Sequence, residues 1–124
     1  MWRAFLVSLS VLIIGPSTGW AVDLQVVDKN CYIEIFDDDD FDESDPHVKL
    51  QGPAEYPTLK DVYGRNWSND IESVIVGSNA TVHAWMSKDF TGPELTLTPG
   101  QRVPKLSKLK ASNSIQSMKV TCGP

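Results

Sequence analysis

Two short stretches of the sequence present side-chain oxygens in the same order. Residues 69–74 read NDIESV and residues 113–118 read NSIQSM, so each has an amide first, isoleucine third and serine fifth. An alternating pattern continues after each stretch, which is typical of a polar turn that leads into a β-strand. Carboxylate, amide and hydroxyl oxygens are ligands for a hard cation, and the same residue types also form ordinary turns. Both interpretations stay open.

Residues 37–45 form the most acidic segment, with seven Asp or Glu residues in nine positions. Such a run is usually a solvated loop. It also has the composition of a calcium-binding segment, because the carboxylates repel one another until a cation joins them. A third interpretation is a surface that docks a basic protein partner. The spacing differs from that of an EF-hand loop, which has a glycine at its sixth position.

The residue types of a catalytic centre are scarce. His47 and His83 are the only histidines, and the sequence contains no pattern of a serine hydrolase, a zinc protease or a phosphate-binding loop. A flexible acidic run does not hold two carboxylates at a fixed separation. We therefore expect a protein that is not an enzyme. Asn66 and Asn79 begin glycosylation acceptor sequences, which matter only in a host that glycosylates.

The N-terminal residues have the order of an export signal. Arg3 precedes an apolar run over residues 4–14, and small residues stand at positions 19 and 21. This order is typical of a cleaved signal peptide, which we place at residues 1–21. The apolar run is shorter than the about 20 residues that span a bilayer. We expect a secreted protein, extracellular or periplasmic, whose mature form begins near Val22 and does not span a membrane.

The charge differs between the two halves of the mature chain. Residues 22–72 contain 14 acidic and 4 basic residues, a net charge of −10, and residues 73–124 contain 2 acidic and 6 basic residues, a net charge of +4. An acidic and a basic side are expected, although a fold can interleave them. The excess of acid disfavours nucleic acid as the main partner, because phosphate contacts need clustered lysine and arginine.

The two cysteines stand near the two ends of the mature chain. Cys31 opens the first apolar run, and Cys122 closes the last expected strand. An exported chain meets an oxidising compartment, so we expect a disulfide that ties the first strand to the last. The mature length of about 100 residues is enough for one domain with one modest core.

The coarse pattern of the sequence is all-β. Short runs rich in β-branched and aromatic residues are separated by Gly, Pro, Asn and Asp, which predicts short strands. The expected strands lie at residues 31–36, 48–50, 73–76, 80–85, 94–97 and 117–121. Short helical turns are expected at residues 59–63 and 106–109.

The sequence also repeats itself. Placing Phe36 over Trp85, with small gaps afterwards, brings Ser73 over Ser117. Each unit has room for four short strands, and two such units predict a two-sheet β-sandwich of two Greek-key motifs. The two units are residues 30–76 and 80–121.

The order of several motifs is similar to that of a known family. An aromatic residue is followed by phenylalanine five residues later and glycine two further on, at Trp85, Phe90 and Gly92, and a Pro-Gly turn stands at residues 99–100. With the Asn-Asp-x-x-Ser stretch at residues 69–73, this order resembles the βγ-crystallin domain, which has two Greek-key motifs. The resemblance implies an N-terminal extension followed by one such domain, at residues 22–29 and 30–124 respectively.

The resemblance also implies two calcium sites. In microbial and ancestral members of the family each motif stretch builds a site, and each site takes ligands from both motifs. One site would use the Asp70 side chain, the Ile71 carbonyl, the Ser117 hydroxyl and a carbonyl at about Asp37. The other would use Ser114, the Ile115 carbonyl, the Ser73 hydroxyl and a carbonyl at about Met86. The first site keeps a carboxylate and is expected to bind calcium; the second has none from its motif and is expected to be degraded.

We therefore predict a secreted, monomeric, non-enzymatic module of this kind, in which calcium stabilises the folded state. The alternative is a secreted inhibitor or toxin-like protein that recognises a protein partner through the acidic segment 37–45. A structural coat or matrix protein is a third interpretation. The resemblance also places Trp67 in the core.

Overall fold

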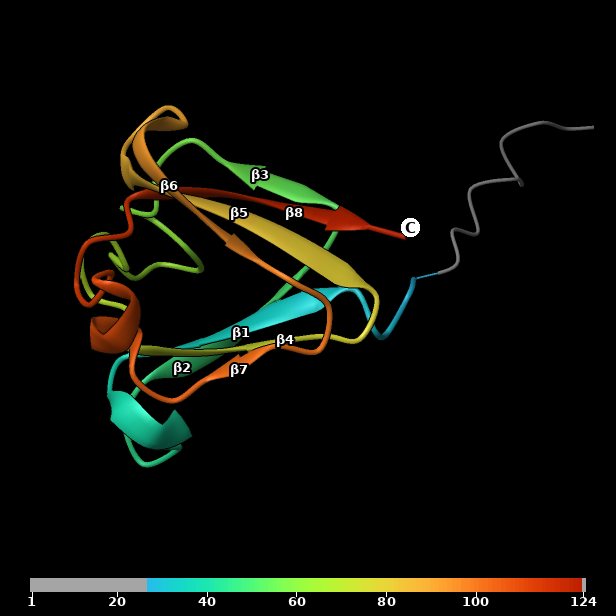
Figure 1. The fold of residues 1–124 in the computed structure, drawn as a ribbon, viewed down its shortest axis with the longest axis horizontal. Helices are drawn as coiled ribbons and strands as arrows, with labels where there is room; N and C mark the ends of the chain where they lie inside the picture. The colour runs from blue at the N-terminus through green and yellow to red at the C-terminus, as the bar shows by residue number, and fades with distance from the viewer. Residues whose placement is uncertain (1–26, 124) are drawn as a thin grey trace, which may run out of the picture.

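The polypeptide folds into two antiparallel sheets packed face to face (Figure 1). The computed structural model describes residues 27–123, so the predicted signal peptide at residues 1–21 and most of the predicted extension at 22–29 lie outside the described residues. No helix in residues 27–123 has the length and hydropathy needed to cross a membrane. The two-sheet arrangement confirms the predicted β-sandwich.

Eight strands make up the two sheets, four from each predicted unit. The first unit contains β1 (Tyr32–Phe36), β2 (His47–Gln51), β3 (Ala54–Tyr56) and β4 (Ser73–Val76). The second contains β5 (Ala80–Ser87), β6 (Thr91–Leu97), β7 (Arg102–Val103) and β8 (Ser117–Cys122). Within residues 27–123, two short 3₁₀ helices, η3 (Asp39–Phe41) and η4 (Leu106–Leu109), follow β1 and β7.

Six of these strands and one helical turn were predicted from composition. The sequence pattern missed β3 and β7, because they are only three and two residues long and are bordered by prolines. The helical turn at 106–109 is confirmed, whereas the one expected at 59–63 is wrong. The amides there bond outside any helix: Leu59 N–H donates to the Gln116 carbonyl, and Val62 pairs with Arg65 in an isolated β-bridge.

The sheets exchange strands between the two units. The strand orders are β2-β1-β4-β7 and β3-β8-β5-β6, so β7 of the second unit completes the first sheet and β3 of the first unit completes the second sheet. At these joints Val74 pairs with Val103, and Tyr56 pairs with Met118. Neither unit forms its sheet without the other, which confirms two interlocked Greek keys in a single body.

The core lies between the sheets and comes from the alternating inward positions of the strands. Ile33 and Ile35 of β1 face it, as do Val82 and Ala84 of β5, and all four are fully buried. Period-two burial is what a sheet with one wet face requires. Trp67, in the loop before β4, is also buried, which confirms the prediction that it belongs to the core.

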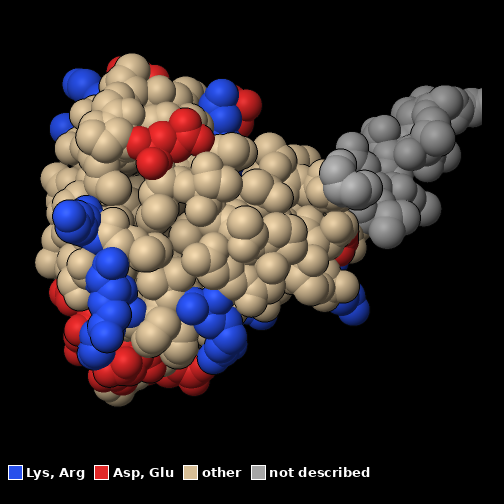
Figure 2. Space-filling view, viewed as in Figure 1, with Lys and Arg blue, Asp and Glu red and all other residues tan. Residues whose placement is uncertain are grey.

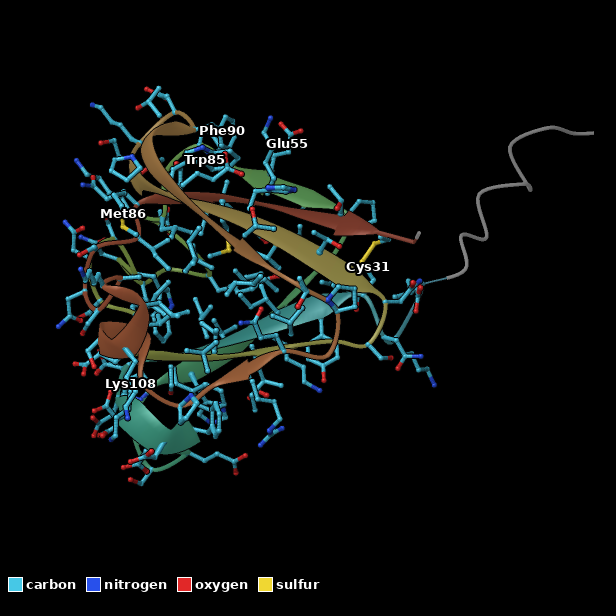
Figure 3. All side chains as sticks on the ribbon, in the orientation of Figure 1. Cys31, Glu55, Trp85, Met86, Phe90 and Lys108 are labelled. Carbon is cyan, nitrogen blue, oxygen red and sulfur yellow. A yellow bond between two sulfur atoms is a disulfide. The ribbon has the colours of Figure 1, made fainter. Side chains whose placement is uncertain are left out.

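A disulfide joins the first strand to the last, as predicted. Cys31 and Cys122 are bonded across a sequence separation of 91 residues, with their Cα atoms 5.5 Å apart. Cys31 is fully buried and lies at the end of the sandwich away from Met86 and Lys108 (Figure 3). The crosslink therefore closes one end of the sandwich, and the two motif stretches and the acidic segment belong to the other end.

Replacing both cysteines by alanine (Cys31→Ala/Cys122→Ala) is expected to lower the free energy of unfolding by up to about 4–5 kcal/mol, because a crosslink over so long a loop restricts the unfolded chain. Urea denaturation of the oxidised protein measures this loss. The wild type under a reducing agent serves as the matched control and should approach the variant. Equal unfolding midpoints for the oxidised wild type and the variant would contradict the expectation.

Candidate functional site

The two motif stretches lie against each other and exchange backbone hydrogen bonds. Asn69 N–H donates to the Ile115 carbonyl over 3.0 Å, and Asn113 N–H donates to the Ile71 carbonyl over 3.1 Å. Asn69 and Asn113 both adopt left-handed backbone, with φ of 62° and 53°, a conformation that asparagine tolerates better than most residues. The structure thus brings the two stretches together, and the Ile71 and Ile115 carbonyls, which the resemblance assigned to calcium, each accept a hydrogen bond.

The serine hydroxyl of the first stretch holds the first hairpin in place. Ser73 is fully buried, and its hydroxyl donates to the Asp38 carbonyl over 2.6 Å and accepts from Phe41 N–H over 3.1 Å. The equivalent hydroxyl, on buried Ser117, donates to the Ser87 carbonyl over 2.6 Å and accepts from Phe90 N–H over 3.1 Å.

The ligand roles of Ser73 and Ser117 stay predictions, and these contacts show what each hydroxyl does within the fold. The resemblance had each hydroxyl serving the site of the opposite motif. In the structure each hydroxyl uses its proton and a lone pair within the hairpin of its own unit. The units do cross, but through the backbone bonds between the motif stretches and through the exchanged strands.

Both hairpins fold back over an aromatic pair, which explains the need for the serine. Phe41 packs edge-on to Phe36 with ring centroids 5.7 Å apart, and Phe90 packs in the same way on Trp85 at 5.3 Å. Phe41 and Phe90 have φ of 57° and 59°, a region that disfavours ordinary residues. The serine hydroxyl satisfies the amide that this folded-back backbone turns inward.

The predicted carboxylate ligand Asp70 is paired with an arginine that the sequence analysis missed. Arg65 Nη2 lies 2.7 Å from Asp70 Oδ2 and 3.4 Å from Asp37 Oδ1. The guanidinium carbon lies 3.9 Å from the centroid of the Trp67 ring. A positive charge therefore stands beside the two aspartates of the predicted calcium site. An arginine five residues before an aspartate in a loop follows no periodic spacing, so no sequence pattern indicated this contact.

The carbonyl predicted for the other site also has a partner that was missed. Gln116 Nε2 donates to the Met86 carbonyl over 3.0 Å, and the hydroxyl of Ser114 donates to the Ser112 carbonyl over 2.9 Å. Calcium needs six to eight oxygen ligands, so an amide N–H and a guanidinium do not belong in its coordination shell. Neither predicted motif site, as this chain forms it, has a donor set that fits calcium.

The residue equivalent to Gln116 in the first unit is Glu72, one position before Ser73 as Gln116 is before Ser117. Burial raises the pKa of Glu72, and the negative charge of nearby Asp39 raises this pKa further. The repeat alignment contained this equivalence, since it placed the serines in register. The position before the serine therefore reaches toward the hairpin in both units.

The acidic segment 37–45 brings three carboxylates together. One carboxylate oxygen from each of Asp38, Asp42 and Asp45 lies within 4.8 Å of the other two. A hydrogen bond with Asp38 raises the pKa of Asp45, and so do burial and the negative charge of Asp42. The pKa of Asp42 is lowered instead, because its carboxylate accepts from both the hydroxyl and the amide of Ser44. The cluster is a region of concentrated negative charge.

The basic half of the sequence folds against this acidic segment. Lys105 Nζ lies 3.4 Å from Asp39 Oδ2 and 3.1 Å from Asp40 Oδ2. Figure 2 shows acidic and basic side chains next to each other at the lower end of the molecule. The expected acidic and basic sides are therefore interleaved here, because the exchange of β7 carries the following loop to the first sheet.

The two glycosylation acceptor residues differ in exposure. Asn66 is exposed, and its side-chain oxygen accepts from Ser68 N–H over 2.9 Å. Asn79 is half-buried, and its amide nitrogen, the atom that would carry a glycan, donates to Asp28. Asn66 is the more accessible of the two.

Replacing Ser73 or Ser117 by alanine is expected to lower the free energy of unfolding by up to about 3 kcal/mol each, because a partly buried carbonyl and a partly buried amide lose their hydrogen-bond partner. Urea denaturation of the single variants measures the loss. Ser107→Ala is the matched control, since Ser107 is exposed in η4. Losses no larger than that of the control would show that the hydroxyls do not hold the hairpins.

Comparison with known proteins identifies the fold. The sequence matches no protein-family model and no curated protein. A solved structure concerned with the evolution of the eye lens βγ-crystallin domain fold is similar over 82% of this chain and 95% of its own, with a TM-score of 0.68 and 19% identity.

Two further solved structures give the same result. A βγ-crystallin from Ciona intestinalis is similar over 71% of this chain and 96% of its own, with a TM-score of 0.59 and 25% identity. A clostrillin double mutant in complex with nickel is similar over 73% and 97%, with a TM-score of 0.57 and 24% identity. The chain therefore has the fold of the βγ-crystallin domain, as the order of its motifs predicted.

Proposed function

We propose that this protein is an exported, non-enzymatic βγ-crystallin-type module that binds calcium through its first hairpin. The observation that carries the proposal is the convergence of Asp38, Asp42 and Asp45, whose carboxylate oxygens lie within 4.8 Å of one another. The proposed ion lies on the acidic segment and not between the motif stretches, because Arg65 and Gln116 supply nitrogen donors there.

The electrostatics of the hairpin favour a divalent cation. The neighbouring acids raise the pKa of Asp45, so the folded chain holds negative charge there at a cost. Calcium prefers oxygen ligands with carboxylates among them, and extracellular modules with dissociation constants of about 10⁻⁴–10⁻³ M fill at millimolar calcium. An ion that binds only the folded hairpin stabilises it by about 1.4 kcal/mol at a tenfold excess over Kd.

Separate observations support the proposals that the protein is exported and that it is not an enzyme. The leader-like sequence at residues 1–21 and the disulfide favour an oxidising compartment. Each histidine is held by a glutamate on an outward position of a sheet: His47 Nδ1 lies 2.9 Å from Glu34 and His83 Nδ1 lies 2.6 Å from Glu94. Each imidazole thus lies on the surface of a sheet with a glutamate as its nearest polar partner.

The second candidate function is recognition of a basic protein partner by the same hairpin. Asp40 favours it, because its side chain is 67% exposed at the tip of η3 although Lys105 lies beside it. Binding of a partner that persists in chelator, and is lost when residues 37–40 become asparagine, would favour recognition over calcium binding.

Calorimetric titration of the exported protein with calcium is expected to show one site, and the Asp42→Asn/Asp45→Asn variant is expected to lose it. Glu43→Gln is the matched control, since it removes a charge from the same hairpin outside the cluster. Affinity is expected to weaken as the pH falls through the raised pKa of Asp45, because protons then compete with the ion for that carboxylate. No heat in the wild type, or an unchanged site in the double variant, would refute the hairpin site.

A further inference from the structure

We infer that Arg65 is a built-in cation of the first motif site, which it closes to calcium, and that removing the guanidinium converts this site into a calcium site. The inference is independent of the proposed hairpin site. It starts from the contacts of Arg65 with Asp70 at 2.7 Å and with Asp37 at 3.4 Å.

One aspartate follows the C-terminal end of a strand, and the other precedes the N-terminal end of the strand paired with it. Asp37 follows β1, and Asp70 lies three residues before β4; these strands are adjacent, with Phe36 opposite Ser73. Antiparallel pairing therefore fixes two acids beside each other at one end of the two inner strands of the first sheet, where their charges repel. A cation between them relieves that repulsion, and Arg65 Nη2 supplies it.

The guanidinium is held in position from its other side. Arg65 and Val62 exchange backbone hydrogen bonds of 2.8 Å and 3.1 Å, and this pairing fixes the start of the side chain. The guanidinium carbon lies 3.9 Å from the ring centroid of Trp67, which is only 2% exposed. Nη1 is buried and makes no hydrogen bond. Stacking of a cation on an indole ring is favourable. The Trp67 ring therefore holds the guanidinium in an orientation in which Nη2 contacts Asp37 and Asp70.

The donor at each motif site matches the charge that it meets. In the first unit two carboxylates face a guanidinium, whereas in the second the uncharged Met86 carbonyl faces the uncharged amide of Gln116 at 3.0 Å. Both sites are satisfied by N–H donors of the chain itself. These N–H donors allow the two motif sites to fold without calcium. In the first unit the donor is Arg65.

The test uses the exported protein in the Asp42→Asn/Asp45→Asn background, so that the hairpin cluster contributes no signal. Arg65→Gln is expected to lower the melting temperature in chelator and to recover it in millimolar calcium, with an affinity at least tenfold above that of the background protein. Adding Asp70→Asn is expected to abolish the gain. Arg102→Gln is the matched control, because Arg102 lies over the ring of Phe41, 4.7 Å from its centroid, and its loss is expected to create no calcium response.

Arg65→Met is a second opening variant, since its unbranched side chain still covers the Trp67 ring if Arg65→Gln fails to fold. Calcium responses in either opening variant that depend on Asp70 would support the inference. It is overturned if both variants respond to calcium no more than the background, or if the background with Arg65 intact already shows a response that Asp70→Asn removes. The hairpin proposal is judged separately, by the variants that leave Arg65 unchanged.

Discussion

Each unit contributes one strand to the sheet of the other unit, and the rest of the structure depends on this exchange. Because β7 pairs with β4 and β3 pairs with β8, neither four-stranded sheet exists without both halves of the chain. The exchange sets the two motif stretches against each other, where Asn69 and Asn113 bond to carbonyls of the opposite stretch. It also carries Lys105 from the basic half to the acidic hairpin. A duplicated sequence is in this way used as one cooperative domain, closed at its far end by the disulfide.

Once the stretches are placed together, their polar atoms need partners, and the chain supplies them internally. A buried carbonyl or carboxylate without a donor costs free energy, whether the donor is an ion or an N–H group. Arg65 and Gln116 provide N–H groups at the two places where the resemblance predicted a cation. A turn with side-chain donors and a cation site are thus two ways to give the polar atoms of these stretches a partner. In this chain the stretches combine the turn with side-chain donors.

The features that the sequence predicted are those that repeat or alternate. Recurring runs of β-branched and aromatic residues between turn residues predicted six strands, and the duplicated aromatic and serine positions predicted two Greek keys. The cysteines at the two ends indicated their pairing. Strands β3 and β7 escaped because two or three residues carry no alternation, and they exist through pairing with neighbours distant in sequence. The contacts of Arg65 escaped for a related reason: they depend on an isolated β-bridge that directs one side chain, and no spacing in the sequence encodes it.

The serines show that a motif found in the sequence can have a structural role that the sequence does not reveal. Ser73 and Ser117 were recognised as equivalent and important, and they are, since both are fully buried at the base of a hairpin. Their hydroxyls bond to the backbone of the folded-back hairpins. The side chain of the preceding residue is the one that extends toward the hairpin. That residue is Glu72 in one unit and Gln116 in the other. The amide of Gln116 closes its own site, whereas the carboxylate of Glu72 adds charge near Asp38 and Asp39. This difference adds to the charge of the acidic segment 37–45, so negative charge concentrates at the first hairpin and not at the second.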